Sequence, residues 1–196
     1  MTAPNAWRLK VLVAICTPGG TDVQFNAKLD SFDGINFGER GVEYRPLLNT
    51  GRLDIWEPEG DAEVKFGGYF VGMNPASVNK LFFSNDPVYS SGYYYLNPSQ
   101  DRDKMRVTIL VTNNSAQTDA TAAVPAGSDG ERYVLADGYL TVNNITWGDE
   151  KHFKGEFTFK FPPRDEDAAN CYFIEDNVET GAELPSIASY TTSVKW

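Results

Sequence analysis

The residues of this chain that could do chemistry are few, and none lies in a catalytic pattern. His152 is the single histidine and stands next to Lys151, in a stretch that reads as a turn. One histidine cannot build a two-histidine metal site, and no sequence neighbour would orient it as an acid–base group. The acidic runs Asp101–Asp103 and Asp165–Asp167 lack the spaced ligands and the glycine of an EF-hand loop. We therefore interpret these charges as solvated turn and loop residues, and predict no metal and no cofactor.

Enzyme motifs are also missing from the sequence, which has no G-x-S-x-G nucleophile elbow, no P-loop and no G-x-G-x-x-G. With 27 Asp and Glu residues, a carboxylate pair for glycoside hydrolysis stays an open alternative to which no residue points specifically. The sequence therefore predicts that the protein is not an enzyme.

Three consecutive tyrosines, Tyr93–Tyr95, form a dense aromatic cluster. Their rings could pack on the chain's own sheet, line an interface between subunits, or stack on sugar rings. The last alternative, with Trp147 as a second stacking platform, predicts a carbohydrate-binding β-sandwich module. Such a module would be a stable monomer that binds sugars, whereas a structural protein would self-associate.

The composition indicates one folded domain spanning residues 1–196, because 41% of the residues are apolar and 12 Phe, 10 Tyr and 4 Trp supply a core. A net charge of −10 excludes a basic surface that grips nucleic acid. No apolar run reaches the length of a membrane helix, so we expect no membrane insertion. The short apolar run Val11–Cys16 predicts a first strand and not a signal peptide. Cys16 and Cys171 both lie in apolar runs, which favours two buried thiols over a single disulfide.

Alternation of apolar and polar residues, the pattern of a strand with one buried face, dominates the chain. Val107–Val111 is more uniformly apolar and predicts a central strand, and Asn143-Asn144 predicts a bulge or bend inside the strand Tyr139–Trp147. The other predicted strands are Val23–Asp30, Ala62–Phe66, Glu156–Phe161, Cys171–Glu175 and Ser189–Trp196. Turn chemistry marks Ala136–Gly138 and Trp147–Asp149. One short helix is predicted at Pro75–Phe83, with Asn74 as its N-cap.

Three long stretches carry little periodic pattern: Asp33–Gly51, Asn85–Lys104 and Gln117–Gly130. Loops of this length are uncommon inside a compact domain and are often completed by partners. Asn85–Lys104 is a candidate insertion. The fold class predicted is mainly β, a sandwich or barrel with one short α-helix and long connections between the strands.

The order of these elements resembles that of tail tube proteins, the major tail proteins of tailed viruses, and is closest in pattern to archaeal tailed viruses. The resemblance rests on an early strand at Phe25–Phe32, an extended segment at Gly41–Leu53, the helix at Pro75–Phe83, and the run from Arg106 to Pro163. It covers about Val23–Asn177. Members of that family are structural proteins of the virion, so the resemblance implies a tail-tube fold and no catalytic site.

The resemblance also implies how the chain works and where. Six subunits would close into a ring, and stacked rings would form the tube through which genomic DNA passes without specific binding. Partners would be further copies and other tail proteins (tape measure, baseplate and terminator), in a virion tail assembled in the host cytoplasm. The terminal arms, 1–8 and 181–196, would bind neighbouring subunits. Contact with the next ring is expected from Glu39, Arg40, Glu43, Tyr44, Arg45 and Arg52. An acidic to neutral lumen is expected from Gln24, Asn26, Lys28, Asp30, Glu63, Lys65, Glu156, Thr158 and Lys160.

Overall fold

The computed structural model describes residues 10–25, 27–37, 42–46, 51–56, 60–70, 88–91, 93–95, 102–147, 153–165, 167 and 169–191. Strands alone make up the regular structure of these residues, and the described part contains no helix that is long and apolar enough to cross a membrane. The strands are β1 (Lys10–Cys16), β2 (Val23–Phe25), β3 (Ala27–Asn36), β4 (Val42–Pro46), β5 (Arg52–Trp56), β6 (Ala62–Phe70), β7 (Val88–Ser90), β8 (Tyr93–Tyr95), β9 (Met105–Thr112), β10 (Gly130–Trp147), β11 (Phe153–Phe161) and β12 (Tyr172–Asp176).

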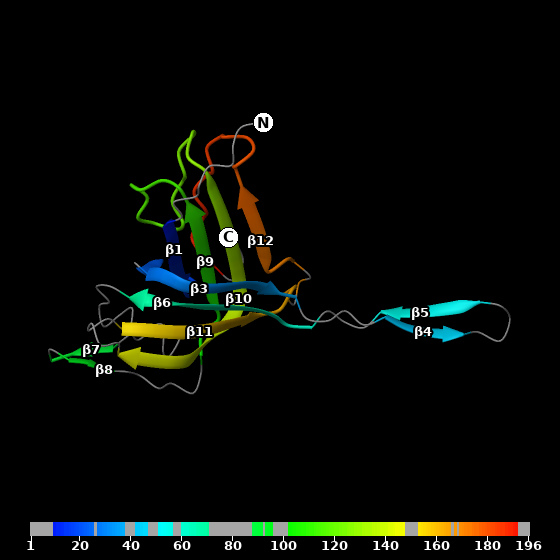
Figure 1. Cartoon of the computed structure of the whole chain (residues 1–196). Helices are drawn as coiled ribbons and strands as arrows, with labels where there is room; N and C mark the ends of the chain where they lie inside the picture. The colour runs from blue at the N-terminus through cyan, green and yellow to red at the C-terminus, as the bar shows by residue number, and fades with distance from the viewer. Residues whose placement is uncertain are drawn as a thin grey trace.

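The body of the molecule is a sandwich of two antiparallel sheets that share one long strand, β10. Its first half pairs with β9 and β12, and the sheet continues from β9 to β1 and β2. The second half pairs with β11, followed by β6 and β3. We call these sheet A (β2-β1-β9-β10-β12) and sheet B (β10-β11-β6-β3). Figure 1 shows the strands of sheet B crossing those of sheet A steeply, which is orthogonal sheet packing.

The corner at which β10 passes from one sheet to the other lies at Asp137-Gly138. The pairing of β10 with β9 shifts register between Leu135 and Gly138, as at a β-bulge. Asp137 takes a left-handed φ of 61°, and its carboxylate Oδ2 accepts from Lys104 Nζ at 2.9 Å. A Cβ on Gly138 would stand 2.3 Å from the carbonyl oxygen of Lys160, so only glycine fits this close approach. The sequence analysis predicted a turn at Ala136–Gly138, and that prediction was wrong: the residues bend a continuous strand.

The main core fills the space between the two sheets. Sheet A contributes Val13, Ile15, Val107 and Ile109, while sheet B contributes mainly aromatic rings. Phe66 and Phe157 stack with ring centroids 5.5 Å apart, and Phe159 and Phe161 with centroids 5.7 Å apart. These rings come from the alternating positions of β6 and β11, so the period-2 pattern marks the buried face of sheet B.

Sheet A is also covered on its other face. A smaller apolar cluster there joins Leu12, Ala14 and Leu110 of the sheet to Ala120, Val124 and Leu184. The last three belong to the connection 113–129 and to the segment 177–191, which we call the C-terminal strap. Val124 and Leu184 exchange backbone hydrogen bonds of 2.8 and 3.0 Å. Burial on both faces explains why every residue of β9 except Val111 is buried.

Two hairpins lie outside the sandwich. β4 pairs with β5, from Val42 opposite Trp56 to Pro46 opposite Arg52, and Figure 1 shows this hairpin projecting well away from the body. β7 pairs with β8. The predicted pattern-poor stretches Asp33–Gly51 and Asn85–Lys104 therefore contain strands, because short hairpins held by their own ladder need little apolar periodicity. Gln117–Gly130, by contrast, is an irregular connection as predicted, with one isolated bridge.

Several other sequence predictions have a clear outcome. The mainly-β class, the central strand at Val107–Val111 and the bulge after Val142 are confirmed. Cys16 and Cys171 are buried and not disulfide-bonded, also as predicted. The single strand predicted at Val23–Asp30 was wrong, because β2 lies in sheet A and β3 in sheet B. Ser189–Thr191 forms no strand, and the helix predicted at Pro75–Phe83 lies outside the described residues.

Candidate assembly surfaces

The outer face of sheet B gathers five of the residues predicted to line a lumen. Lys160 stands between Tyr139 and Glu63 in the ladder, and Thr158 stands between Thr141 and Lys65. Glu156 lies one step further along β11, opposite Gly67. Because side chains alternate along a strand, all of these project from the face opposite the aromatic core. The resulting polar face is defined here by Glu63, Lys65, Glu156, Thr158 and Lys160.

Charges on the polar face are balanced and partly paired. Glu63 Oε1 lies 3.0 Å from Lys65 Nζ. A Cβ on Gly67 would lie 3.5 Å from Cγ of Glu156, so the Glu156 side chain passes over this glycine. Thr158 is buried on the same face, where Asn143 Nδ2 donates to its hydroxyl at 2.6 Å. Two acids and two lysines sum to zero charge, and Lys154, two residues before Glu156 on the same side of β11, adds one positive charge. Such a nearly neutral surface neither strongly attracts nor strongly repels a polyanion.

The remaining predicted lumen residues do not join this group. Gln24 is in β2, and its Nε2 donates to Asp119 Oδ1 at 2.7 Å. The backbone N–H of Ala120 donates to Gln24 Oε1 at 3.0 Å, so Gln24 anchors the connection 113–129 over sheet A. Asn26 lies outside the described residues. Lys28 and Asp30 belong to β3 in sheet B, although their side chains are not among those described.

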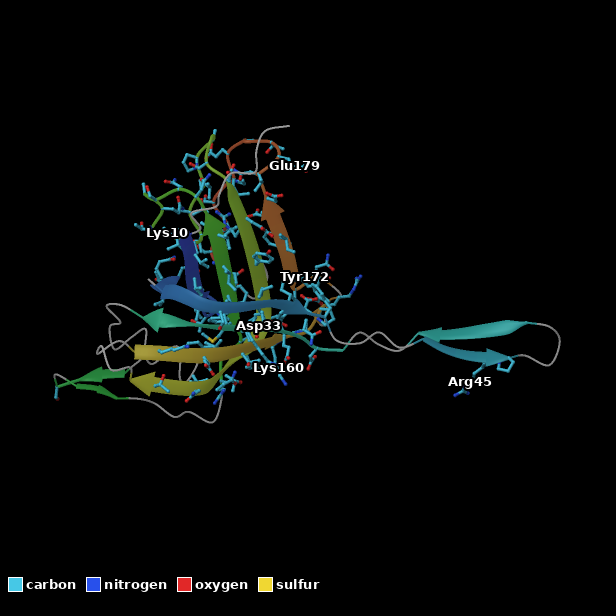
Figure 2. All side chains as sticks on the ribbon, in the orientation of Figure 1. Lys10, Asp33, Arg45, Lys160, Tyr172 and Glu179 are labelled. Atoms are coloured by element: carbon cyan, nitrogen blue, oxygen red, sulfur yellow. The ribbon has the colours of Figure 1, made fainter. Side chains whose placement is uncertain are left out.

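The residues predicted to contact a neighbouring ring also lie only partly within the described residues. Glu43, Tyr44 and Arg45 lie in β4 and Arg52 in β5, so the projecting hairpin carries four of the six. Arg45 is exposed, and Figure 2 shows it far from the labelled residues of the sandwich. Glu39 and Arg40 lie outside the described residues. The β4–β5 hairpin therefore carries most of the residues predicted to contact a neighbouring ring.

Arg106, which the sequence analysis did not single out, is fully buried beneath the C-terminal strap. Its Nη1 donates to the carbonyl of Ala188 at 2.6 Å, and its Nη2 lies 2.8 Å from Asp22 Oδ1. The guanidinium carbon also stands 5.6 Å from the ring centroid of Tyr190, a cation–π distance. One side chain on β9 therefore holds the far end of the strap and the start of β2 together.

Arg132 makes the equivalent contacts from β10 and is likewise fully buried. Its Nη1 donates to Glu175 Oε2 at 2.8 Å and to the carbonyl of Pro185 at 2.6 Å, while Nη2 donates to the carbonyl of Ala122. Burial lowers the pKa of Arg132, and the carboxylate of Glu175 opposes that shift. Because the unperturbed pKa of arginine is so high, we take the group to stay protonated at neutral pH.

Asn177 fixes the beginning of the strap. Its Oδ1 accepts from the backbone N–H of Gly130 at 2.7 Å, and its Nδ2 donates to the carbonyls of Ser128 and Ala182. The sequence analysis expected 181–196 to be an arm that binds neighbours. As far as Thr191, this segment instead covers the chain's own sheet A, because Leu184 and Tyr190 are buried there.

Sequence reasoning missed Arg106, Arg132 and Asn177 for one physical reason. The hydrogen-bond partners of the arginines in the strap lie 82 and 53 residues away in the chain, so no local spacing marks them. The alternation of apolar and polar residues does not decide on which face of sheet A either arginine side chain lies. The one local signal was that both adjoin apolar residues: Arg106 lies between Met105 and Val107, and Arg132 directly precedes the run Tyr133–Ala136.

Two other predictions remain untested, the absence of a metal site and the sugar-stacking alternative. No group of three or more potential metal ligands occurs among the described residues. Tyr93–Tyr95 forms β8, opposite β7, but its side chains are not among those described, and the same holds for Trp147. The sugar-stacking alternative therefore stays a prediction.

Comparisons with known proteins add little to this geometry. No protein family model matches the sequence, and no curated protein matches it. Among solved structures, the chain is similar to one in the 6-fold symmetrised anti-feeding prophage baseplate, with a TM-score of 0.44 and 11% identity, over 89% of this chain and 97% of that chain. A second is from the sheath/tube terminator of an extracellular contractile injection system, with a TM-score of 0.41 and 9% identity, again over 89% and 97%. At such scores neither likeness assigns a family, and the role of the chain is argued from its own residues.

Proposed function

We propose that this chain is a structural protein of a viral tail, which assembles into hexameric rings that stack into a tube for the passage of DNA. The observation that carries the proposal is the form of sheet B. It combines a polar, charge-balanced outer face with two borders, β3 and the second half of β10, that pair with no further strand in the described part of the chain.

Open sheet borders favour pairing between copies. An uncovered edge strand presents unpaired N–H and C=O groups, and closing a sheet into a barrel removes such edges. If β3 of one copy pairs with the second half of β10 in the next, the B sheets of a ring become one continuous wall. The polar face would then line the channel, and sheet A with its strap would lie outside.

The nearly neutral charge of the outer face of sheet B suits this role. A basic lumen would hold DNA through its phosphates, and a strongly acidic one would oppose its entry. The polar face is neither basic nor strongly acidic, because it combines Glu63 and Glu156 with Lys65 and Lys160. A tube also requires a contact that does not close within one ring, because such a contact lets rings stack. We assign this contact to the projecting β4–β5 hairpin.

Electron microscopy and thiol labelling together test the proposal. Negative-stain images of the concentrated protein should show stacked rings with a central channel. The native cysteines are 0% exposed, so a cysteine introduced at an exposed site is the reactive one. A bulky maleimide should label Lys160→Cys in the monomer but not in tubes, whereas Thr118→Cys, on the exposed connection over sheet A, should label in both.

Two outcomes would contradict the proposal. Compact monomers at every salt and protein concentration, together with binding to a glycan array, would favour the carbohydrate-binding module instead. Tubes in which Lys160→Cys stays as reactive as Thr118→Cys would show that the polar face does not line the channel.

A further inference from the structure

β12 is the border strand of sheet A, and its free side is ready for another strand. Its ladder partner is β10 alone among the described strands. The carbonyl of Cys171 accepts from Ala136, and the N–H of Asn177 donates to Gly130. Because hydrogen-bonding direction alternates along an antiparallel strand, residues 172, 174 and 176 direct their N–H and C=O groups away from β10. Figure 1 shows β12 at the border of the sheet, with no other strand beside that edge.

Exposed apolar side chains flank the same border. Ile174, at the centre of β12, is 50% exposed and Phe37 is 46% exposed. The ring of Phe37 packs on Tyr172 with centroids 4.8 Å apart, which extends the apolar surface to the start of β12. Natural edge strands are usually protected by lysine, proline or a bulge. Tyr172–Ile174 has none of these, and the charged residues Glu175 and Asp176, which also protect an edge, stand only at the end of the strand. The border around Ile174 therefore has the features of an interface.

Acidic side chains lie at both ends of this border. Asp176 and Glu179 are exposed at the end of β12, and residues 172–191 contain no lysine or arginine. Before the start of the strand lies Arg164, which bridges to Asn170 and is followed by the acids Asp165 and Asp167. Figure 2 shows Tyr172 and Glu179 at opposite ends of β12. A strand that fits this border is therefore basic at the end that lies beside Asp176 and Glu179.

The chain itself contains an element with the complementary pattern. In the β4–β5 hairpin, Arg45 and Arg52 lie where β4 passes to β5, and Glu43 lies nearer the root. Both β4 and β5 are five residues long, as is β12. An isolated two-stranded hairpin is at best marginally stable in water. The β4–β5 hairpin therefore gains most from a third strand along one of its edges.

We propose that the β12 border of one copy receives the β4–β5 hairpin of a second copy, with the turn end of the hairpin beside Asp176. This inference rests on the proposed function, because it names the surface on which the hairpin of a neighbouring ring docks. The contact adds main-chain hydrogen bonds, covers Ile174 and Phe37, and places Arg45 near Asp176 and Glu179. Within one copy the hairpin stands clear of β12 (Figure 1), so a second copy must supply it.

A proline at position 174 tests the main-chain part of the contact. Ile174→Pro removes an N–H that points outward and leaves the bonds between β12 and β10 in place, which is the position at which an edge strand tolerates proline. We expect Ile174→Pro to keep single rings and lose tubes in negative-stain images, whereas the control Ile174→Val keeps both. Thermal unfolding of both variants checks that the sandwich is intact.

Exchanging the charges of two residues tests the ionic part of the contact and shows whether the partner is the hairpin of a second copy. Arg45→Glu and Asp176→Arg should each shorten the tubes, and the double variant should restore their length. A mixture of Arg45→Cys and Asp176→Cys proteins should form a disulfide-linked pair under oxidation, because the native cysteines are buried.

The possible failures are distinguishable. If the unaltered protein forms no rings or tubes, the proposed function fails and this inference fails with it. If tubes form, and folded Ile174→Pro still forms them at full length without a cross-link between positions 45 and 176, the hairpin docks elsewhere and only this inference is overturned.

Discussion

Replacing Gly138 by alanine tests the corner on which the two-sheet arrangement depends. An added Cβ would lie 2.3 Å from the carbonyl oxygen of Lys160, 2.6 Å from Cζ of Phe159 and 2.8 Å from Cβ of Phe161. One obstacle is backbone, and the other two belong to phenylalanine side chains packed in the core, so none moves cheaply. Overpacking of a core costs about 1–3 kcal/mol, and three simultaneous clashes place this variant at the upper end. For a domain of this size, about 3 kcal/mol corresponds to a melting temperature lower by about 6–12 °C.

Calorimetry or circular dichroism of the purified variant measures this loss. Gly127→Ala is the matched control, because Gly127 has a φ of +85° with no atom within 4 Å of the added Cβ. That variant carries backbone strain alone, which costs about 1 kcal/mol. If Gly138→Ala melts within the range of Gly127→Ala, then β10 does not pass this close to β11, and the reasoning about the corner is refuted.

Two further predictions concern buried polar groups. Arg106→Met should lower the free energy of unfolding by about 3 kcal/mol in a denaturant titration, the low end for a broken buried ion pair. The loss is at the low end because Asp22 keeps 22% of its side chain exposed and is hydrated. As a control, the exposed Arg102→Met should change the free energy of unfolding by about 0.5 kcal/mol or less. Partial burial, followed by a hydrogen bond to Glu131, raises the pKa of Tyr133 to about 12 from 10.0. The unfolded chain therefore loses this proton first, and the stability contributed by Tyr133, complete below pH 10, declines between pH 10 and pH 12. An ultraviolet difference titration against Tyr133→Phe measures the phenol directly, and ionisation near pH 10 would contradict the assignment.

Much of the strand content follows from local sequence. Ala62–Phe66 and Glu156–Phe161 alternate because one side of sheet B faces the core, and this periodicity is visible without any structure. Val107–Val111 is apolar except at Thr108, because its strand is covered on both faces. The bulge after Val142 and the two buried thiols were predictable for the same reason, since each depends on residues adjacent in the chain.

Sheet membership did not follow from alternation. Val23–Asp30 has one continuous pattern, yet β2 and β3 pair with strands of different sheets. Ala136–Gly138 has the composition of a turn and bends a strand instead, because the glycine admits the backbone of β11. A local pattern states which side of a residue is buried and does not state which strand lies next to it. Gln24 was therefore grouped with residues of a sheet to which it does not belong.

The sequence by itself determined a folded, mainly-β chain with an alternating polar face on β6 and β11, and these properties need only the two-residue period of a strand. The tertiary structure alone decided the corner at Gly138, the strap held by Arg106 and Arg132, and the open border at Ile174. Each of these depends on groups tens of residues apart in the chain that meet only after the sheets have packed. A buried arginine and an exposed isoleucine oppose the usual preferences of their side chains, so only the folded chain shows where they lie.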